Sequence, residues 1–214
     1  MNPNITILVA DDHPMLLKGL VDELQDYGFN VLEGVSNGAK ALEVIYSKKP
    51  TIALLDINMP ILTGFEVIEK CKARGLDTRF IILTSYKEKE VILKAQKMGV
   101  SGYLLKDEPF VEIKNCIQAA MKGVFYASKV FNEIFEMEIY PELEKIKYLS
   151  PSERTIIRLI AQEKSSKEIG ELLSVSIRTI QKHRSNIITK LDLPSSPNAL
   201  SLWVYENKEL FLSL

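Results

Sequence analysis

TIALLDINMP, at residues 51–60, begins with five uncharged residues that run directly into Asp56, and Asn58 and Pro60 end the run. A short apolar run bounded by turn residues is typical of a strand buried on both faces of a parallel sheet. Ligands of open α/β sheets bind outside the carboxyl ends of the strands, where the strand order reverses. We therefore expect Asp56 to lie at a functional edge of such a sheet.

The residues around this stretch alternate between strand and helix patterns. Further strands are predicted at residues 5–10, 29–35, 79–84 and 100–105. Helices are predicted between residues 13 and 28 and over about 38–48, 64–74, 88–98 and 109–121. Five strand–helix pairs predict a five-stranded parallel, doubly wound α/β sheet with strand order 2-1-3-4-5.

Length and composition fit a globular protein with two domains. The chain has 214 residues, of which 46% are hydrophobic and 26% charged. No apolar run approaches the roughly 20 residues of a membrane span, and the amino terminus does not read as a signal peptide. Cys71 and Cys116 match no metal-ligand spacing, so we expect a reducing, cytoplasmic compartment and no membrane partner.

Polar residues follow the predicted strands where each strand ends. Asp11 and Asp12 follow the first strand, Asp56 the third, Thr84 ends the fourth and Lys106 follows the fifth. Singly, Asp12 could be a helix cap, Thr84 a turn former and Lys106 a surface cation. With strand order 2-1-3-4-5, however, all of them converge on one edge of the sheet.

Carboxylates gathered in one crevice repel, and Mg²⁺ with oxygen ligands is their natural neutraliser. One aspartate could then attack a phosphoryl group and form an aspartyl phosphate. Lys106 and the Thr84 hydroxyl would hold the phosphoryl oxygens where negative charge develops.

This constellation resembles the receiver domain of bacterial two-component response regulators. The motifs DD, DINMP, TS and GYLLKD carry the resemblance, which covers residues 5 to about 122. It implies that Asp56 is the phosphoacceptor, that Asp12 binds Mg²⁺ directly and that Asp11 acts largely through water. The backbone carbonyl of Asn58 would complete the metal shell. Thr84 and Tyr103 are similar to the family's switch pair, although Tyr103 could also be an ordinary strand aromatic.

The second half of the chain is predicted to be helical. A mildly acidic helical linker covers residues 123–147, and Ser150 to Glu153 form a capping box that opens the next domain. A second capping box, Ser165 with Glu168, precedes a short helix, a turn and a helix with a basic free face. With a fourth helix near the carboxyl terminus, residues 148–214 predict an all-α helix-turn-helix domain.

This half resembles the LuxR-type, or NarL/FixJ-type, DNA-binding domain through LSPSER and SKEIGELLSVSIRTIQKHRSNIITKL. The resemblance implies that the helix after Ser176 enters the major groove. Base edges would be contacted by Gln181, Lys182 and Ser185, and phosphates by Thr179, His183 and Arg184. For His183, an ordinary helix-surface position is the alternative.

The same resemblance bears on the last helix and on two departures from the family pattern. The last helix would pair two subunits on DNA through Ala199, Leu202 and Trp203, although Trp203 could instead pack inside its own domain. Glu163 stands where glycine is usual, which predicts a different helix cap. Gly170 stands where alanine is usual, at a cost of about 1 kcal/mol.

Together these features predict a phosphorylation-controlled transcription regulator and not an enzyme. Its partners would be a sensor histidine kinase, promoter DNA and a second copy of the chain. A phosphohydrolase of the haloacid dehalogenase class would need a second Asp at position 58, where Asn58 stands. A receiver that acts through protein contacts without specific DNA binding is the alternative.

Overall fold

The computed structural model describes residues 5–208 and 211. They form two compact units, Met1–Glu133 and Ile134–Leu214. No helix in these residues is long and apolar enough to cross a membrane.

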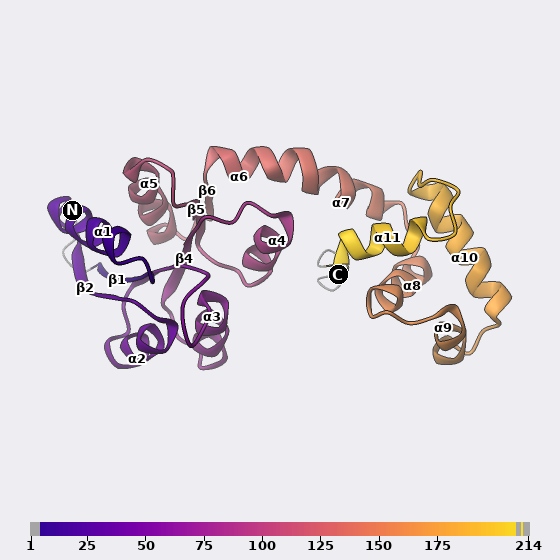
Figure 1. Cartoon of the computed structure of the whole chain (residues 1–214), viewed down its shortest axis with the longest axis horizontal. Helices are drawn as coiled ribbons and strands as arrows, with labels where there is room; N and C mark the ends of the chain where they lie inside the picture. The colour runs from indigo at the N-terminus through magenta and orange to yellow at the C-terminus, as the bar shows by residue number, and fades with distance from the viewer. Residues whose placement is uncertain (1–4, 209–210, 212–214) are drawn as a thin grey trace. The chain divides into compact units, whose positions relative to one another are not determined.

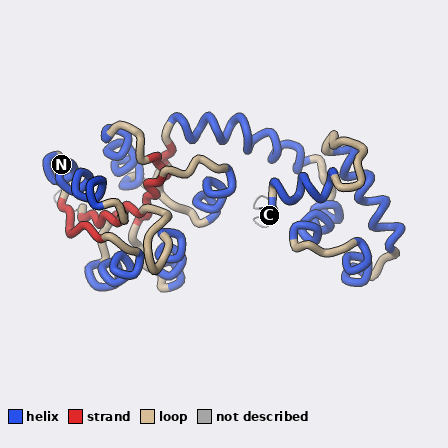
Figure 2. The backbone as a smooth tube through the Cα atoms, viewed as in Figure 1, coloured by secondary structure: helices blue, strands red, loops and turns tan. Residues whose placement is uncertain are grey.

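The first unit is built on a parallel sheet with the order β2-β1-β3-β4-β5-β6 (Figures 1 and 2). Its strands are β1 (Thr6–Ala10), β2 (Asn30–Val35), β3 (Ile52–Leu55), β4 (Arg79–Thr84), β5 (Gly102–Leu105) and β6 (Tyr126–Ala127). The predicted α/β fold and the order 2-1-3-4-5 are confirmed. The sixth strand was not predicted, because its two residues lie in the expected linker and form a strand through their pairing with β5.

Helices cover both faces of this sheet: α1 (Pro14–Asp26), α2 (Gly38–Lys48), α3 (Gly64–Ala73), α4 (Lys89–Lys97) and α5 (Phe110–Met121) (Figure 1). Alternate strand residues such as Val9, Leu54 and Leu83 form one buried cluster with α1 and α5. Because successive strand side chains point to opposite faces, the intervening residues face the remaining helices. The strands β1, β3, β4 and β5 are therefore buried on both sides, as their apolar composition predicted, whereas the edge strand β2 is only partly buried.

Three helical segments follow without a break: α6 (Lys129–Ile134), the π-helical turn Phe135–Ile139 and α7 (Tyr140–Lys147). The division between the two units falls after Glu133, so α6 lies almost wholly in the first unit and α7 in the second. The sequence predicted a helical linker here, but not the π-helical turn within it.

The second unit contains α8 (Pro151–Ala161), α9 (Ser166–Leu173), α10 (Ile177–Lys190) and α11 (Ala199–Glu206), which are the expected helices of a helix-turn-helix domain. Both predicted capping boxes are present, with Ser150 and Ser165 each accepting a hydrogen bond from the backbone of the glutamate three residues later. The serine therefore caps helix donors that would otherwise lack a partner.

Glu163 and Gly170 occupy positions with specific backbone demands. Glu163 has φ +64°, the left-handed conformation that a glycine would adopt at the end of α8, so the cap geometry is retained by a residue that favours it less. A Cβ on Gly170 would lie 2.9 Å from the backbone oxygen of Val175. Gly170 therefore permits close approach of α9 to the following turn, and the expected cost relative to alanine does not apply unchanged.

Candidate functional sites

The carboxyl edge of the sheet brings Asp56 beside β1. The backbone N–H of Asp56 donates a 2.9 Å hydrogen bond to the carbonyl of Ala10. Gly64, at the start of α3, lies so close that a Cβ there would be 2.2 Å from the carbonyl oxygen of Asp56. The Asp56 loop is thus held between β1 and α3, and Asp56 is almost fully buried.

Lys106 bridges two carboxylates at this edge. Its Nζ lies 2.8 Å from Oδ2 of Asp11 and 2.9 Å from Oδ2 of Asp56. All three side chains are largely removed from water, so the ammonium neutralises charge that solvent cannot screen. The same residue is tied to β4, since its backbone N–H donates to the carbonyl of Thr84 at 2.9 Å.

Burial raises the pKa of Asp56, and the hydrogen bond from Lys106 opposes this increase only in part. For Lys106, burial disfavours the ammonium, but the adjacent carboxylates of Asp11 and Asp56 outweigh this effect and raise the pKa. The ammonium is therefore retained beside the two carboxyl groups.

Three of the four predicted metal ligands, Asp11, Asp12 and Asp56, lie together. Ligand atoms of Asp11, Asp12, His13 and Asp56 lie within 4.8 Å of one another. Two of the carboxylate oxygens, Asp11 Oδ2 and Asp12 Oδ1, are buried and accept no hydrogen bond of normal geometry from the described residues. Lys106 Nζ lies 2.8 Å from Asp11 Oδ2, and His13 Nδ1 lies 2.9 Å from Asp12 Oδ1. Buried oxygens with spare lone pairs fit a hard divalent cation.

The two expected switch residues are both buried. Thr84 is fully inaccessible, and its Oγ1 accepts a 3.3 Å hydrogen bond from the backbone N–H of Tyr86. Tyr103 is 1% exposed and donates from its hydroxyl to the carbonyl of Tyr86 at 2.9 Å. Burial raises the pKa of Tyr103 well above its usual value. The Tyr103 side chain is therefore buried in this structure.

Two residues near this edge were missed by the sequence analysis. Tyr86 contacts both switch residues through its backbone, and its hydroxyl accepts a hydrogen bond from the side-chain amide of Asn58. His13 joins the acidic cluster. Its position directly after the two aspartates was an available signal, whereas nothing local marked Tyr86.

In the second unit, the free face of α10 forms a shallow groove of about 620 Å³, lined by Ser176, Arg178, Thr179, Gln181, Lys182 and Ser185. Four of the six predicted DNA-contacting residues lie on it. Arg178 was not predicted, although one helical turn separates it from Gln181 and Lys182 and its cation could have been found by that spacing.

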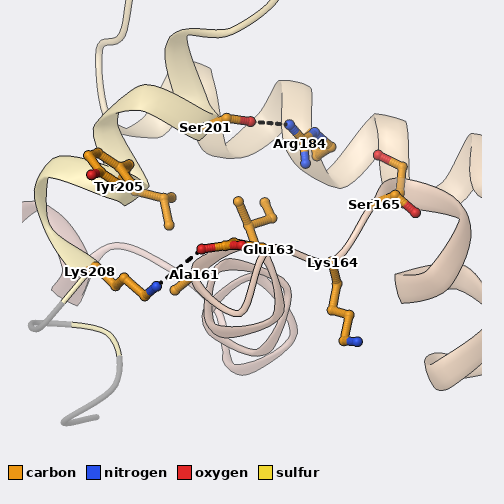
Figure 3. A pocket seen from close by; sticks show the side chains of 11 residues that line it. Ala161, Glu163, Lys164, Ser165, Arg184, Ser201, Tyr205 and Lys208 are labelled. Atoms are coloured by element: carbon orange, nitrogen blue, oxygen red, sulfur yellow. Dashed lines mark hydrogen bonds and ion pairs between the residues drawn. The ribbon is translucent and has the colours of Figure 1, made fainter.

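The other two predicted contacts are turned toward neighbouring helices. His183 lines a small pocket with residues of α8, and Arg184 is half-buried, with Nη2 donating to Oγ of Ser201 in α11 at 3.0 Å (Figure 3). Burial lowers the pKa of Arg184. Arg184 and Ser201 line a second pocket of about 300 Å³, shown in Figure 3, which also contains the ion pair of Glu163 with Lys208, 3.4 Å apart.

The predicted dimer-interface residues of α11 differ in their exposure to solvent. Ala199 and Trp203 are buried inside the unit, and Trp203 Nε1 donates to Oε2 of Glu142 in α7 at 2.9 Å. Leu202 and Tyr205 are exposed. Trp203 therefore packs inside its own unit, which was the alternative to a role in the dimer interface.

A parallel sheet with an acidic, lysine-bridged edge, followed by a helix-turn-helix unit, defines a receiver domain joined to a DNA-binding domain. Comparison with known families agrees with this class. Residues 7–118 match the response regulator receiver domain, and residues 147–202 match the bacterial regulatory proteins of the luxR family.

Similar proteins share this organisation along their length. The nitrate/nitrite response regulator protein NarL of Escherichia coli is 30% identical, over 95% of this chain and 96% of its own. The transcriptional regulatory protein DesR of Bacillus subtilis is 32% identical, over 92% and 95%. RcsB of Salmonella enterica, solved bound to a promoter with the phosphomimetic BeF₃⁻, has 23% identity, a TM-score of 0.58 and coverage of 95% and 99%. The chain belongs to the NarL/FixJ-type two-component response regulators with a LuxR-type DNA-binding domain.

Proposed function

We propose that a sensor histidine kinase phosphorylates Asp56 in a Mg²⁺-dependent reaction, and that this promotes dimerisation and promoter binding in the cytoplasm, where the DNA lies. The observation that carries the proposal is Lys106 Nζ, which lies within 2.9 Å of both the Asp11 and the Asp56 carboxylates. We assign residues 1–122 to the receiver, 123–147 to the linker and 148–214 to the DNA-binding domain. The chain acts as a regulator and not as an enzyme.

In the phosphorylation step, a carboxylate oxygen of Asp56 forms a bond to phosphorus as the P–N bond to the kinase histidine breaks. The imidazole leaves with a proton from solvent. Asp11, Asp12, Asp56 and the Asn58 carbonyl would hold Mg²⁺, which supplies positive charge against the carboxylates and the phosphoryl oxygens. Lys106 and the Thr84 hydroxyl stabilise the remaining phosphoryl oxygens, because they lie at the adjacent strand ends.

Phosphorylation then shifts a two-state equilibrium through Thr84 and Tyr103 toward the state that dimerises. On DNA, Gln181, Lys182 and Ser185 face base edges, and Thr179, His183 and Arg184 contact phosphates. The exposed face of α10 supports this placement for Gln181, Lys182 and Ser185. RcsB, with its published promoter complex, provides a parallel for such an assembly.

Mass spectrometry of the intact protein tests the phosphoacceptor. Wild type, Asp56→Asn and the control Asp107→Asn are incubated with a small phosphodonor, with Mg²⁺ or with a chelator. We expect one phosphoryl group on wild type and on the control, only with Mg²⁺, and none on Asp56→Asn. An adduct of equal yield on Asp56→Asn would refute the assignment.

Binding to duplex DNA separates this function from a receiver that acts through protein contacts alone. A selected genomic fragment is titrated at several salt concentrations, with and without beryllofluoride. A regulator that binds DNA will show salt-dependent affinity that increases with the phosphoryl mimic. Affinity that is absent at all salt concentrations would favour the protein-contact alternative.

A further inference from the structure

The ring of Tyr103 packs against an aromatic residue of the linker helix. The ring centroids of Tyr103 and Phe131, in α6, lie 5.2 Å apart with an interplanar angle of 48°, within the range of a favourable aromatic pair. Phe131 is 4% exposed, and the ring centroid of Phe125 lies 6.1 Å from that of Phe131. Tyr103 is thus held from two sides, by this ring and by the hydrogen bond to Tyr86.

Strand β6, which pairs with β5, is followed almost directly by α6, and this short connection fixes Phe131 at its position. Strand β6 pairs with β5 so that Ala127 lies opposite Tyr103. Ser128 follows and is 1% exposed, and its hydroxyl accepts a 3.4 Å hydrogen bond from the backbone N–H of Phe131. Only three residues separate Ala127 from Phe131, so a change in the Tyr103 ring position would change its packing against the start of α6.

The other end of the same helical segment is attached to the DNA-binding unit. In α7, Glu142 accepts the hydrogen bond from the Trp203 indole, and Ile146 is buried. The π-helical turn Phe135–Ile139 connects α6 to α7. Turns of this kind interrupt regular helix hydrogen bonding and are often found at functional positions.

We propose that Phe131 is a positioning residue that passes the state of Tyr103 to the linker helix, and through it to the Glu142–Trp203 contact. The inference rests on the proposed phosphorylation of Asp56. It adds a specific route from the phosphorylation site to the linker. Among the ring contacts of Phe131 that the structure describes, Tyr103 is the one that belongs to the phosphoacceptor site, and the other is Phe125. Phe131 and Glu142 belong to one continuous helical segment, which joins the two contacts.

The protein contains a single tryptophan, so its tryptophan fluorescence reports Trp203 alone. Full-length wild type, Phe131→Ala and Phe131→Leu are labelled with a small phosphodonor and Mg²⁺. The labelled fraction is measured by intact mass, and emission is followed in the same samples. Phe131→Leu retains apolar volume in case the alanine variant folds poorly. Phe110→Leu is the matched control, because Phe110 forms a similar pair with Tyr27, 5.0 Å apart, elsewhere in the receiver.

We expect a change in Trp203 emission on labelling in wild type and in Phe110→Leu, and loss of that change in both Phe131 variants at unchanged labelling. A full response in a labelled Phe131 variant would overturn the inference. So would labelled wild type with no response, or an equal loss in Phe110→Leu. Wild type that takes no label would overturn the proposed function, and this inference with it.

Discussion

Lys190 Nζ, in α10, lies 2.7 Å from Oε2 of Glu153, in α8, and the same carboxylate accepts the backbone N–H of Ser150 at 2.7 Å. One nearly buried glutamate therefore closes the capping box of α8 and anchors the end of the helix that carries the DNA-facing residues. Lys190 and the backbone N–H of Ser150 both contact Oε2 of Glu153, so the negative charge of Glu153 is important to the stability of this unit.

The Glu153 contact makes the stability of the second unit dependent on pH. Burial alone would raise the pKa of Glu153, but hydrogen bonds from Lys190 and Ser150 outweigh it and hold the pKa below the ordinary 4.5. The stabilisation is therefore present above pH about 4.5 and is lost as the pH falls through the lower folded-state pKa. Glu153→Gln should lower the free energy of unfolding by roughly 1 to 2 kcal/mol at neutral pH.

Urea unfolding followed by Trp203 emission, from pH 7 to pH 3, would measure this effect. The difference between wild type and Glu153→Gln should shrink with acidification. Glu168→Gln is the control, because Glu168 closes an equivalent capping box but is exposed and has only a 3.8 Å contact with Lys164. A pH-independent difference would contradict the prediction.

Removal of the Lys106 charge should destabilise the receiver and make it respond to Mg²⁺. In Lys106→Met, two buried carboxylates lose their shared cation, which we expect to cost about 3 kcal/mol. A bound divalent ion would restore part of this stability. Calorimetry with and without Mg²⁺ measures it. Lys87→Met removes only a surface pair with Asp107 and should leave the receiver transition unchanged.

The left-handed residue at the end of α8 gives a stabilising substitution. Glu163→Gly should raise the free energy of unfolding by about 1 kcal/mol, because glycine adopts positive φ without the Cβ penalty. The lost Lys208 pair is exposed and contributes little. In contrast, Gly170→Ala should give no gain, because its Cβ would meet the Val175 carbonyl. Thermal unfolding of both variants would show whether Glu163→Gly raises the melting temperature and Gly170→Ala does not.

The assignment of DNA contacts predicts two different losses of affinity. Lys182→Ala should relax preference at particular base pairs, each worth roughly 1 to 3 kcal/mol. Arg184→Ala should weaken all sequences alike and, if it contacts phosphate, lower the salt slope by about one unit. Since Arg184 donates to Ser201, an unchanged salt slope would instead indicate lost packing between α10 and α11. Affinities measured for one site and its single-base variants, at several salt concentrations, distinguish base readout, phosphate contact and lost packing.

Spacing of half-sites follows from the two-fold dimer that we propose. Two copies of α10 should require half-sites about one helical turn apart, near 10 base pairs centre to centre. Insertion of about half a turn between half-sites should abolish cooperative binding, and insertion of a full turn should restore part of it.

The sequence by itself determined the order of strands and helices, because each element has its own local pattern of apolar and polar residues. It also placed Asp11, Asp12, Asp56, Thr84 and Lys106 on one edge, since parallel strands end at the same side of a sheet. The capping boxes at Ser150 and Ser165 were equally local. Each requires only two residues three positions apart.

Tertiary structure alone decided the contacts between elements that carry no such local signal. Strand β6 has two residues and exists through its pairing with β5, and the Phe131 ring meets Tyr103 because that pairing starts α6 beside it. The outward side of α10 was predictable from helical spacing, yet Arg184 turns toward Ser201 because α11 offers a hydroxyl there. Such contacts depend on which surfaces pack together. The residues next to a position in the sequence do not specify which surface will pack against it.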